Sequence, residues 1–391
     1  MKKKIAILGS TGSIGKSTLA VLHKDIKNFD VVLLYANNNY LKLIEQAKIF
    51  KAKNVYINNS TFYHKVKNAL KKTKTKVFTG SIPIDKMVSK KIDYTMSCIV
   101  GLAGLQPTIE AAKISKTLAI ANKEAIICGW SILSKVIKKH NTKLQPVDSE
   151  HFSIMELTKD HDDDEIEEII ITASGGPFLN LPKNKFQSIK PSEAINHPNW
   201  SMGKKISIDS ATLMNKVFEV IEACRIFKFN ENKYRVVIHP QSYVHSVIRF
   251  KNGLIKMILY DTDMKIPISN TLYGTKNIYL NNKKIDTNLL SKISFAKVDI
   301  KKFPSLKLIN KCLNLGLAAS IIVNASNETL VNLFLEGKIG FLDIVGSINK
   351  IFKDKEFKKY AKRKPNSVKE IKLIDKWARI KINDMLVSNK L

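Results

Sequence analysis

The chain has few of the residues that build metal clusters, disulfide frameworks and membrane spans. Its 391 residues include four cysteines, Cys98, Cys128, Cys224 and Cys312, which lie far apart without a C-x-x-C pair. Neither a zinc cluster nor a disulfide framework is indicated, and a reducing compartment fits best. No apolar run approaches the roughly 18 residues of a membrane helix, and the run after MKKK is too short for a signal peptide. We therefore expect a cytoplasmic protein with no membrane partner.

Acidic residues are also scarce. The chain has 34 Asp and Glu against 65 Lys and Arg, which gives a formal net charge of +31. Such a balance is one mark of nucleic-acid binding. The lysines are nevertheless spread along the whole chain without an interleaved aromatic patch, as the product of an AT-biased genome would be. We predict no nucleic-acid partner, and we expect the basic surface to attract phosphorylated ligands.

The length is sufficient for two or three domains. Residues 1–148 alternate between helical segments and short apolar runs such as KIAIL, VVLLYA, NVYI and TLAIA, which predicts a parallel sheet with helices on both faces. Residues 149–285 contain the strand-like runs EEIIITA, YRVVI and LIKMILY, and residues 286–391 are mostly helical in pattern. We therefore predict an α/β and α+β multidomain protein: a Rossmann-like domain, a central α+β catalytic domain and a C-terminal helical bundle. The acidic run HDDDEIEE is interpreted as a solvated loop or helix end.

A glycine-rich turn, GSTGSIGKST, follows the first apolar run. A Walker loop requires glycine where this chain has Ser10, because the first glycine must stand five residues before Gly15. Gly9, Gly12 and Gly15 instead give G-x-x-G-x-x-G, a relaxed dinucleotide fingerprint directly after a strand. The spacing favours a dinucleotide over a nucleoside triphosphate, although a glycine turn without a ligand is an alternative.

Two stretches carry carboxylates suited to a cation. In PVDSEH, Asp148 and Glu150 would point to the same side if the stretch ends a strand, which suits a cation bound by oxygen ligands. The alternative is that they are two surface acids at a strand end without a ligand. Further on, Asn215, Lys216 and Glu219 fall on one face of a predicted helix that begins near ATLMNK, with Asp209 or Ser210 as its N-cap. A polar face of this kind indicates a ligand, since a structural helix presents an apolar stripe to its core, although a solvated polar face is the alternative. Lys216 and the Ser210 hydroxyl suit a phosphate, and Glu219 could complete a three-carboxylate site.

Other polar residues lie where a ligand would need them. Lys123 and Glu124 follow the strand-like run TLAIA, at the sheet edge where doubly wound folds bind ligands. Ser174 precedes two glycines that permit close backbone approach. Trp200 lies in HPNWSMG, which suits a lid that excludes water, with core packing as the alternative. Of the histidines, His197 on this loop is favoured for function.

These motifs, in order, resemble one family. GSTGSIG, NKE, VDSEH, SGGPF, HPNWSMGKKISIDSATLMNK, HPQS and NASNE are similar to the motifs of the 1-deoxy-D-xylulose 5-phosphate reductoisomerase family, over nearly the whole chain. The resemblance implies that the glycine turn binds NADPH. It also implies a homodimer, a small phosphorylated sugar as substrate, and Mg²⁺ or Mn²⁺ as cofactor, with domains at 1–148, 149–285 and 286–391 and a lid near 195–204.

The resemblance further implies the site residues. The metal ligands would be Asp148, Glu150 and Glu219. Catalytic groups would be Lys123, Glu150 and His197. The substrate would contact Lys123, Ser149, Glu150, Ser174, His197, Trp200, Ser210, Asn215, Lys216 and Glu219. NADPH would contact Thr11, Gly12, Ser13, Ile14, Asn37, Asn38, Asn39, Asn122, Glu124 and Gly203. The reaction implied is rearrangement of the pentulose phosphate to a branched aldehyde, which NADPH reduces to 2-C-methyl-D-erythritol 4-phosphate.

The chain departs from the family pattern after the second strand. Asn37, Asn38 and Asn39 stand where the family usually has glycine and then a basic or small residue, which weakens the expected contact with the 2′-phosphate of NADPH. No acidic residue replaces them, so the usual contact with an NAD ribose is missing as well. A semialdehyde dehydrogenase is the main rival, but it needs a nucleophilic cysteine, and none of the four lies in a motif near a base. The alternative without catalytic activity is a basic protein that contains a Rossmann unit and binds nucleic acid.

Overall fold

The structure is a computed structural model that describes residues 2–88, 91–200, 202–274 and 287–388. These residues form two compact units. The described residues of the first unit fall within Met1–Ala125, Ile132–Phe152 and Asp263–Asn281, and those of the second within Ile126–Ser131, Ser153–Thr262 and Asn282–Leu391. The predicted division into three domains stays a prediction, and its boundary at 285–286 lies outside the described residues.

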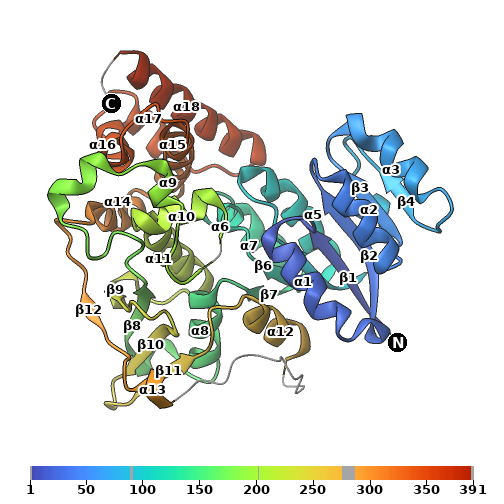
Figure 1. Ribbon diagram of the computed structural model, residues 1–391, viewed down its shortest axis with the longest axis horizontal. Coiled ribbons are helices and arrows are strands. Elements are labelled where there is room, and N and C mark those ends of the chain that lie inside the picture. Colours follow the sequence, from blue (N-terminus) through green and yellow to red (C-terminus); the bar gives the residue numbers. More distant parts are fainter. Residues whose placement is uncertain (1, 89–90, 201, 275–286, 389–391) are drawn as a thin grey trace. The chain divides into compact units, whose positions relative to one another are not determined.

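The first unit is built on a parallel sheet of seven strands in the order β4-β3-β2-β1-β5-β6-β7 (Figure 1). The strands are β1 (Lys3–Leu8), β2 (Phe29–Ala36), β3 (Asn54–Ile57), β4 (Lys76–Phe78), β5 (Ile92–Ser97), β6 (Ser115–Ile120) and β7 (Lys143–Pro146). Most are short apolar runs buried on both faces, as expected for a sheet covered by helices. The strand order reverses between β1 and β5, so their carboxyl ends open the crevice in which such sheets bind ligands.

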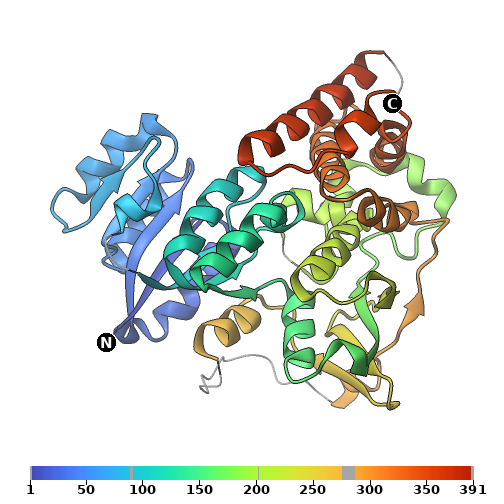
Figure 2. The same ribbon diagram turned by 180° about the vertical axis from the view of Figure 1, so that it is seen from behind.

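Helices cover both faces of this sheet, as the opposite views of Figures 1 and 2 show. They include α1 (Ser13–His23), α2 (Tyr40–Ile49), α3 (Tyr63–Leu70), α4 (Ile84–Met87), α5 (Leu105–Ile114), α7 (Trp130–His140) and α12 (Lys265–Tyr273). The chain also forms α6 (Lys123–Ile127) and α8 (Ser149–Thr158), and Ile154 and Leu157 of α8 pack with residues of the second sheet described below. Helices α6, α7 and α8 each contain residues of both units. Helix α12 comes from much later in the chain and packs on α1, and its Thr271 hydroxyl bonds the Tyr94 hydroxyl at 2.9 Å.

The second unit contains a mixed sheet of five strands in the order β11-β10-β8-β9-β12. Its strands are β8 (Ile166–Ala173), β9 (Tyr234–Ile238), β10 (Val244–Phe250), β11 (Ile255–Leu259) and β12 (Ala296–Lys297). Strands β8 and β9 run parallel, and the other neighbours are antiparallel. A helix, α11 (Met214–Phe227), packs on β8 through Val220 and Ala223, which join an apolar cluster with Ile169 and Ile171.

Helix α15 (Leu317–Leu335) is the centre of the helical part of this unit. It is buried over most of its length and contacts α10 (Lys204–Ala211), α14 (Leu308–Leu315), α16 (Phe341–Ile351), α17 (Phe357–Ala361) and α18 (Val368–Val387). Helices α14 to α18 of this bundle are drawn in orange and red in Figures 1 and 2. Two short helices, α9 (Pro191–Ala194) and α13 (Thr287–Leu290), complete the unit. The predicted fold class is confirmed: a Rossmann-like parallel sheet, a second α+β part and a helical bundle.

No helix in the described parts of the chain has both the length and the apolar character that crossing a bilayer requires.

Candidate functional site

The glycine-rich turn joins β1 to α1, as the sequence predicts. A Cβ atom at Gly15 would lie 2.3 Å from the Gly9 carbonyl oxygen, so only glycine permits the helix to start this close to the turn. Gly12 is the N-cap of α1, and Gly12 and Ser13 are exposed. The first N–H groups of the helix therefore face solvent, an arrangement that binds phosphate. This turn and the first helical turn hold four predicted cofactor contacts, Thr11, Gly12, Ser13 and Ile14.

The other predicted cofactor residues lie at the ends of elements. Asn37, Asn38 and Asn39 follow β2 and are exposed, and Asn39 accepts a hydrogen bond from Lys42 N (3.1 Å) as the N-cap of α2. In the second unit, Gly203 is the N-cap of α10, and a Cβ there would meet open space.

Asn122 is buried at the carboxyl end of β6, and both ends of its side-chain amide form hydrogen bonds. Its Nδ2 donates to Ile99 O (2.5 Å), Gly101 O (3.1 Å) and Glu124 Oε2 (3.0 Å), and its Oδ1 accepts from Ala125 N (2.7 Å). These bonds tie the turn after β5 to the start of α6. Asn122 thereby fixes the position from which Lys123 projects.

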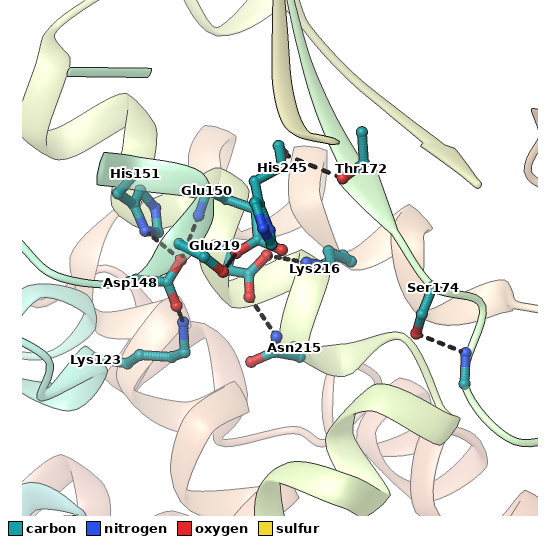
Figure 3. A network of polar contacts seen from close by, with 12 residues as sticks. Lys123, Asp148, Glu150, His151, Thr172, Ser174, Asn215, Lys216, Glu219 and His245 are labelled. Atoms are coloured by element: carbon teal, nitrogen blue, oxygen red, sulfur yellow. Dashed lines mark hydrogen bonds and ion pairs between the residues drawn. The ribbon is translucent and has the colours of Figure 1, made fainter. Parts of the chain in front are cut away.

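Lys123 pairs with Asp148, whose carboxylate also bonds His151 Nδ1 at 3.0 Å (Figure 3). Burial alone would raise the pKa of Asp148, but the adjacent charges and hydrogen bonds of Lys123 and His151 hold it well below its usual range. Asp148 is therefore ionised. Next to it, the Ser149 hydroxyl donates to Glu150 Oε2 at 2.6 Å, and Glu150 is 8% exposed.

The expectation that Asp148 and Glu150 lie at the end of a strand was wrong. Strand β7 ends at Pro146, so VDSEH does not continue it. Asp148 instead precedes α8, where its carbonyl accepts from Phe152 N (2.8 Å), and Glu150 lies in the first helical turn. Proline fixes φ and lacks an N–H donor, which favours an end to the strand at this position.

The polar face of α11 forms as predicted. Asn215 Nδ2 donates to Glu219 Oε1, and Lys216 Nζ donates to Glu219 Oε2 at 2.5 Å (Figure 3). The Lys216 ammonium and the Glu219 carboxylate are both buried, with Lys216 7% and Glu219 1% exposed. Such burial keeps the charges strongly coupled, since little water screens them.

The helix begins within the predicted ATLMNK stretch, but the predicted N-cap at Asp209 or Ser210 was wrong. Asp209 and Ser210 lie inside α10, which begins after Gly203, and α11 begins only at Met214. The two helices are separated at Leu213, which adopts a left-handed conformation with φ of 57°. Such a conformation is unfavourable for leucine and persists only where packing enforces it; Leu213 is 1% exposed.

The three predicted metal ligands form a group that could hold an ion. One carboxylate oxygen from each of Asp148, Glu150 and Glu219 lies within 4.8 Å of the others. The packing of α8 and α11 is consistent with this grouping, because Ile154 and Val220 share an apolar cluster and Glu150 lies one helical turn before Ile154. Three carboxylates provide the oxygen ligands that Mg²⁺ and Mn²⁺ prefer.

A second polar group surrounds Ser174. A Cβ at Gly176 would lie 3.0 Å from Ser210 O, so this glycine lets the loop after β8 approach the end of α10. The Ser174 hydroxyl and His197 Nε2 are 2.9 Å apart. His197 Nδ1 accepts from the backbone N–H groups of residues 199 and 200, so its Nε2–H donates to Ser174.

His197 is neutral in this arrangement. Burial, together with the positive charge of Lys216, lowers the pKa of the His197 imidazole to about 4. Because the folded protein binds this proton less readily than the unfolded chain does, the neutral imidazole contributes to folding stability. The contribution is fully present above the ordinary pKa of about 6.5 and is lost as the pH falls through about 4.

We predict that His197 titrates with a midpoint near pH 4 in the folded protein, far below an ordinary histidine. Histidine-selective NMR between pH 3.5 and 8 measures this midpoint, and the His197→Gln variant assigns the signal. The Lys216→Gln variant should raise the midpoint, because it removes a nearby positive charge. A His197 midpoint near 6.5 in the wild-type protein would contradict the buried, neutral assignment.

The predicted lid is partly anchored. The Trp200 ring lies 6.0 Å from the His245 ring in a T-shaped contact, and His245 lies 4.3 Å from the Tyr260 ring. Asn199 Nδ2 donates to Pro240 O (2.6 Å) and Ser242 Oγ (2.8 Å), which ties the loop to the HPQS turn. Ser201, within the predicted lid, lies outside the described residues.

Sequence reasoning missed two residues of this region. His151, which hydrogen-bonds Asp148, stands three residues later in the same VDSEH motif, a spacing that places both on one side of a helix start. Asn199 lies inside the quoted HPNW stretch, but its partners on the HPQS turn are distant in sequence, so no local pattern indicates the contact.

Comparison with known proteins identifies the family of this chain. Three family models match the chain. The model of 1-deoxy-D-xylulose 5-phosphate reductoisomerase matches residues 5–129, and the model of the C-terminal domain of this enzyme matches residues 144–227. A further model, described as the DXP reductoisomerase C-terminal domain, matches residues 259–381. A protein of that name from Pelagibacter ubique is 46% identical, covering 98% of this chain and 100% of that one. The chain belongs to the 1-deoxy-D-xylulose 5-phosphate reductoisomerase family.

Solved structures of reductoisomerases share the fold over its full length. The Zymomonas mobilis reductoisomerase in complex with NADPH aligns with a TM-score of 0.91 at 34% identity, covering 99% of each chain. A reductoisomerase in complex with NADPH, fosmidomycin and magnesium aligns with a TM-score of 0.93 at 33% identity, also covering 99% of each chain. A reductoisomerase of Wolbachia pipientis is 40% identical, covering 99% of this chain and 98% of that one.

Proposed function

We propose that this protein is a 1-deoxy-D-xylulose 5-phosphate reductoisomerase, which forms 2-C-methyl-D-erythritol 4-phosphate for isoprenoid precursors with NADPH and a divalent cation. The observation that carries the proposal is the group of three carboxylates with oxygens within 4.8 Å of one another. It occurs in a member of a family whose solved structures include complexes with NADPH and with magnesium.

The metal ligands proposed are Asp148, Glu150 and Glu219. Their fit rests on the donor set, because carboxylate oxygens suit Mg²⁺ or Mn²⁺ and the two glutamates are almost fully buried. When bound, the cation would polarise the ketone of the substrate, and NADPH would supply the hydride. Lys123 would stabilise negative charge that develops on the substrate, and Glu150 would take part in proton transfer.

A phosphate-binding role is proposed for the second polar group. Because His197 donates to the Ser174 oxygen, the Ser174 O–H is left to donate to a phosphate. The Ser210 hydroxyl, the Asn215 amide and the Lys216 ammonium provide further donors, and Ser149 and Trp200 would contact the rest of the substrate. Phosphate binding supplies energy, remote from the reacting carbons, that could close the lid over the site.

NADPH is proposed to bind along the carboxyl edge of the Rossmann-like sheet. Its pyrophosphate would lie on the exposed N–H groups at Gly12 and Ser13, flanked by Thr11 and Ile14. The remaining proposed contacts are Asn37, Asn38, Asn39, Asn122, Glu124 and Gly203. The division of the chain into a cofactor domain (1–148), a catalytic domain (149–285) and a helical domain (286–391) belongs to the same proposal.

A cytoplasmic homodimer is also proposed. The four cysteines are free, three of them buried, which suits a reducing compartment. Strand β11 forms one edge of the five-stranded sheet and exposes Ile255 (58%) and Met257 (43%). An apolar edge strand of this kind favours pairing with a second copy. Sedimentation velocity at micromolar protein concentration tests for the dimer. A sedimentation coefficient of a monomer at all concentrations measured would disprove it.

The function is tested by following NADPH absorbance after addition of 1-deoxy-D-xylulose 5-phosphate. We expect oxidation of NADPH with added Mg²⁺ or Mn²⁺, loss of the signal with a chelator, and recovery when excess metal is restored. Oxidation that persists in chelator would refute the metal-dependent reaction. A salt-sensitive shift of a polynucleotide without any NADPH oxidation would favour the binding-only rival.

A further inference from the structure

Asparagines gather where two neighbouring parallel strands end. Ala36 and Ile57 are register partners at the ends of β2 and β3. The backbone pairing continues past them, because Asn58 N donates to Ala36 O (2.9 Å) and Asn59 N donates to Asn37 O (3.1 Å). The side chains that follow each strand are therefore held next to one another.

The amides of these residues form two cross-strand hydrogen bonds. Asn58 Nδ2 donates to Asn37 Oδ1 at 2.9 Å, and Asn59 Nδ2 donates to Asn38 Oδ1 at 3.1 Å. We call Asn37, Asn38, Asn58 and Asn59 the asparagine ladder. Because its bonds occupy the Asn37 and Asn38 oxygens, these two exposed residues can offer their NH₂ groups as donors to a ligand.

The adjacent residue extends this row of donors. Asn39 Oδ1 accepts from Lys42 N, which leaves its NH₂ group as the outward donor as well. Lys42 itself is engaged by both carboxylate oxygens of Glu45, at 2.9 Å each. Lys65 lies over the Tyr40 and Phe62 rings, 5.4 and 5.8 Å from their centroids. The loop thus offers several N–H donors and carries no charged side chain of its own.

We propose that the asparagine ladder makes the protein selective for NADPH by donating neutral amide hydrogen bonds to the 2′-phosphate. Asn58 and Asn59 are positioning residues, since they act by fixing the amide orientation of Asn37 and Asn38. The inference rests on the NADPH site proposed above. Donors suit a phosphate, which only accepts, whereas an NAD ribose is usually held by a carboxylate acceptor.

The Asn58→Ala variant tests the ladder, because the described contacts of the Asn58 side chain are confined to it. The probes are adenosine 2′,5′-bisphosphate and AMP, whose dissociation constants are measured by calorimetry on the full chain. We expect bisphosphate binding to weaken about three- to tenfold, the size of one lost hydrogen bond, with AMP unchanged. Asn68→Ala, on the exposed face of α3, is the matched control and should change neither.

A second variant reverses the amide direction. In Asn59→Asp, an oxygen replaces the NH₂ that faces Asn38 Oδ1, while the side chain can still accept from Thr61 N (3.1 Å) and keep its local turn. Bisphosphate binding should weaken more than in Asn58→Ala, and Asn68→Asp controls for the added charge. The bisphosphate preference should also fall only slightly between 50 and 300 mM salt, because neutral donors are weakly screened.

The outcomes separate this inference from the site on which it rests. Bisphosphate that fails to compete with NADPH would refute the proposed NADPH site. Competition with wild-type affinity in both ladder variants would refute the ladder and leave the site intact. Equal weakening of bisphosphate and AMP would also overturn the inference, because the ladder would then support the loop without reading the 2′-phosphate.

Discussion

In the Glu219→Gln variant, metal-dependent turnover should fall by at least about 100-fold, while NADPH binds as in the wild-type protein. Glu219 is 1% exposed and belongs to the three-carboxylate group, so the change removes one ligand oxygen and its negative charge. It also removes the carboxylate charge that lies 2.5 Å from the buried Lys216 ammonium in the wild-type protein. Steady-state rates across a magnesium titration measure the loss, and nucleotide fluorescence measures NADPH affinity.

Glu222→Gln is the matched control, since Glu222 is also buried (2% exposed) on α11 but stands outside the carboxylate group. It should retain metal-dependent turnover, and a thermal melt of both variants separates loss of fold from loss of metal. A Glu219→Gln protein with an unchanged magnesium midpoint and rate would remove Glu219 from the ligand set.

The sequence predicts well what depends on a short stretch of chain. Asn215, Lys216 and Glu219 meet on one side of α11 because helical spacing alone brings residues three and four apart together. The turn at Gly15 follows likewise from strand, glycine and helix in immediate succession. Such local agreement does not depend on the rest of the fold.

What the sequence does not predict depends on distant packing. Leu213 takes a left-handed conformation that leucine disfavours, because its side chain is buried with Ala173, Ile238 and Phe303 from distant segments. The N-cap was wrongly predicted at Asp209 or Ser210 for that reason. The packing of α12 on α1 was not predicted for the same reason, because it depends on segments far apart in sequence. The hydrogen bond between Thr271 of α12 and Tyr94 joins residues 177 positions apart.

Gly15→Ala should abolish measurable NADPH binding. The added Cβ would lie 2.3 Å from Gly9 O and 2.6 Å from Ser10 Cα, both of them backbone atoms. No side chain can rotate away to relieve these contacts, so the turn itself must open and its N–H groups lose their common direction. A cost of about 3 kcal/mol corresponds to an affinity loss of more than about 100-fold. Titration of NADPH fluorescence measures it.

Gly346→Ala provides the control, because a Cβ at Gly346 on α16 would meet no atom within 4 Å. The same substitution there should leave NADPH affinity unchanged and stabilise the helix by about 1 kcal/mol. Wild-type NADPH affinity in the Gly15→Ala variant would contradict this prediction. It would show that the turn has room for a side chain and that binding of the pyrophosphate does not require the close approach of helix and turn. Because the Cβ would strike the turn and not the carboxylate group, the metal dependence of any remaining turnover should match that of the wild-type protein.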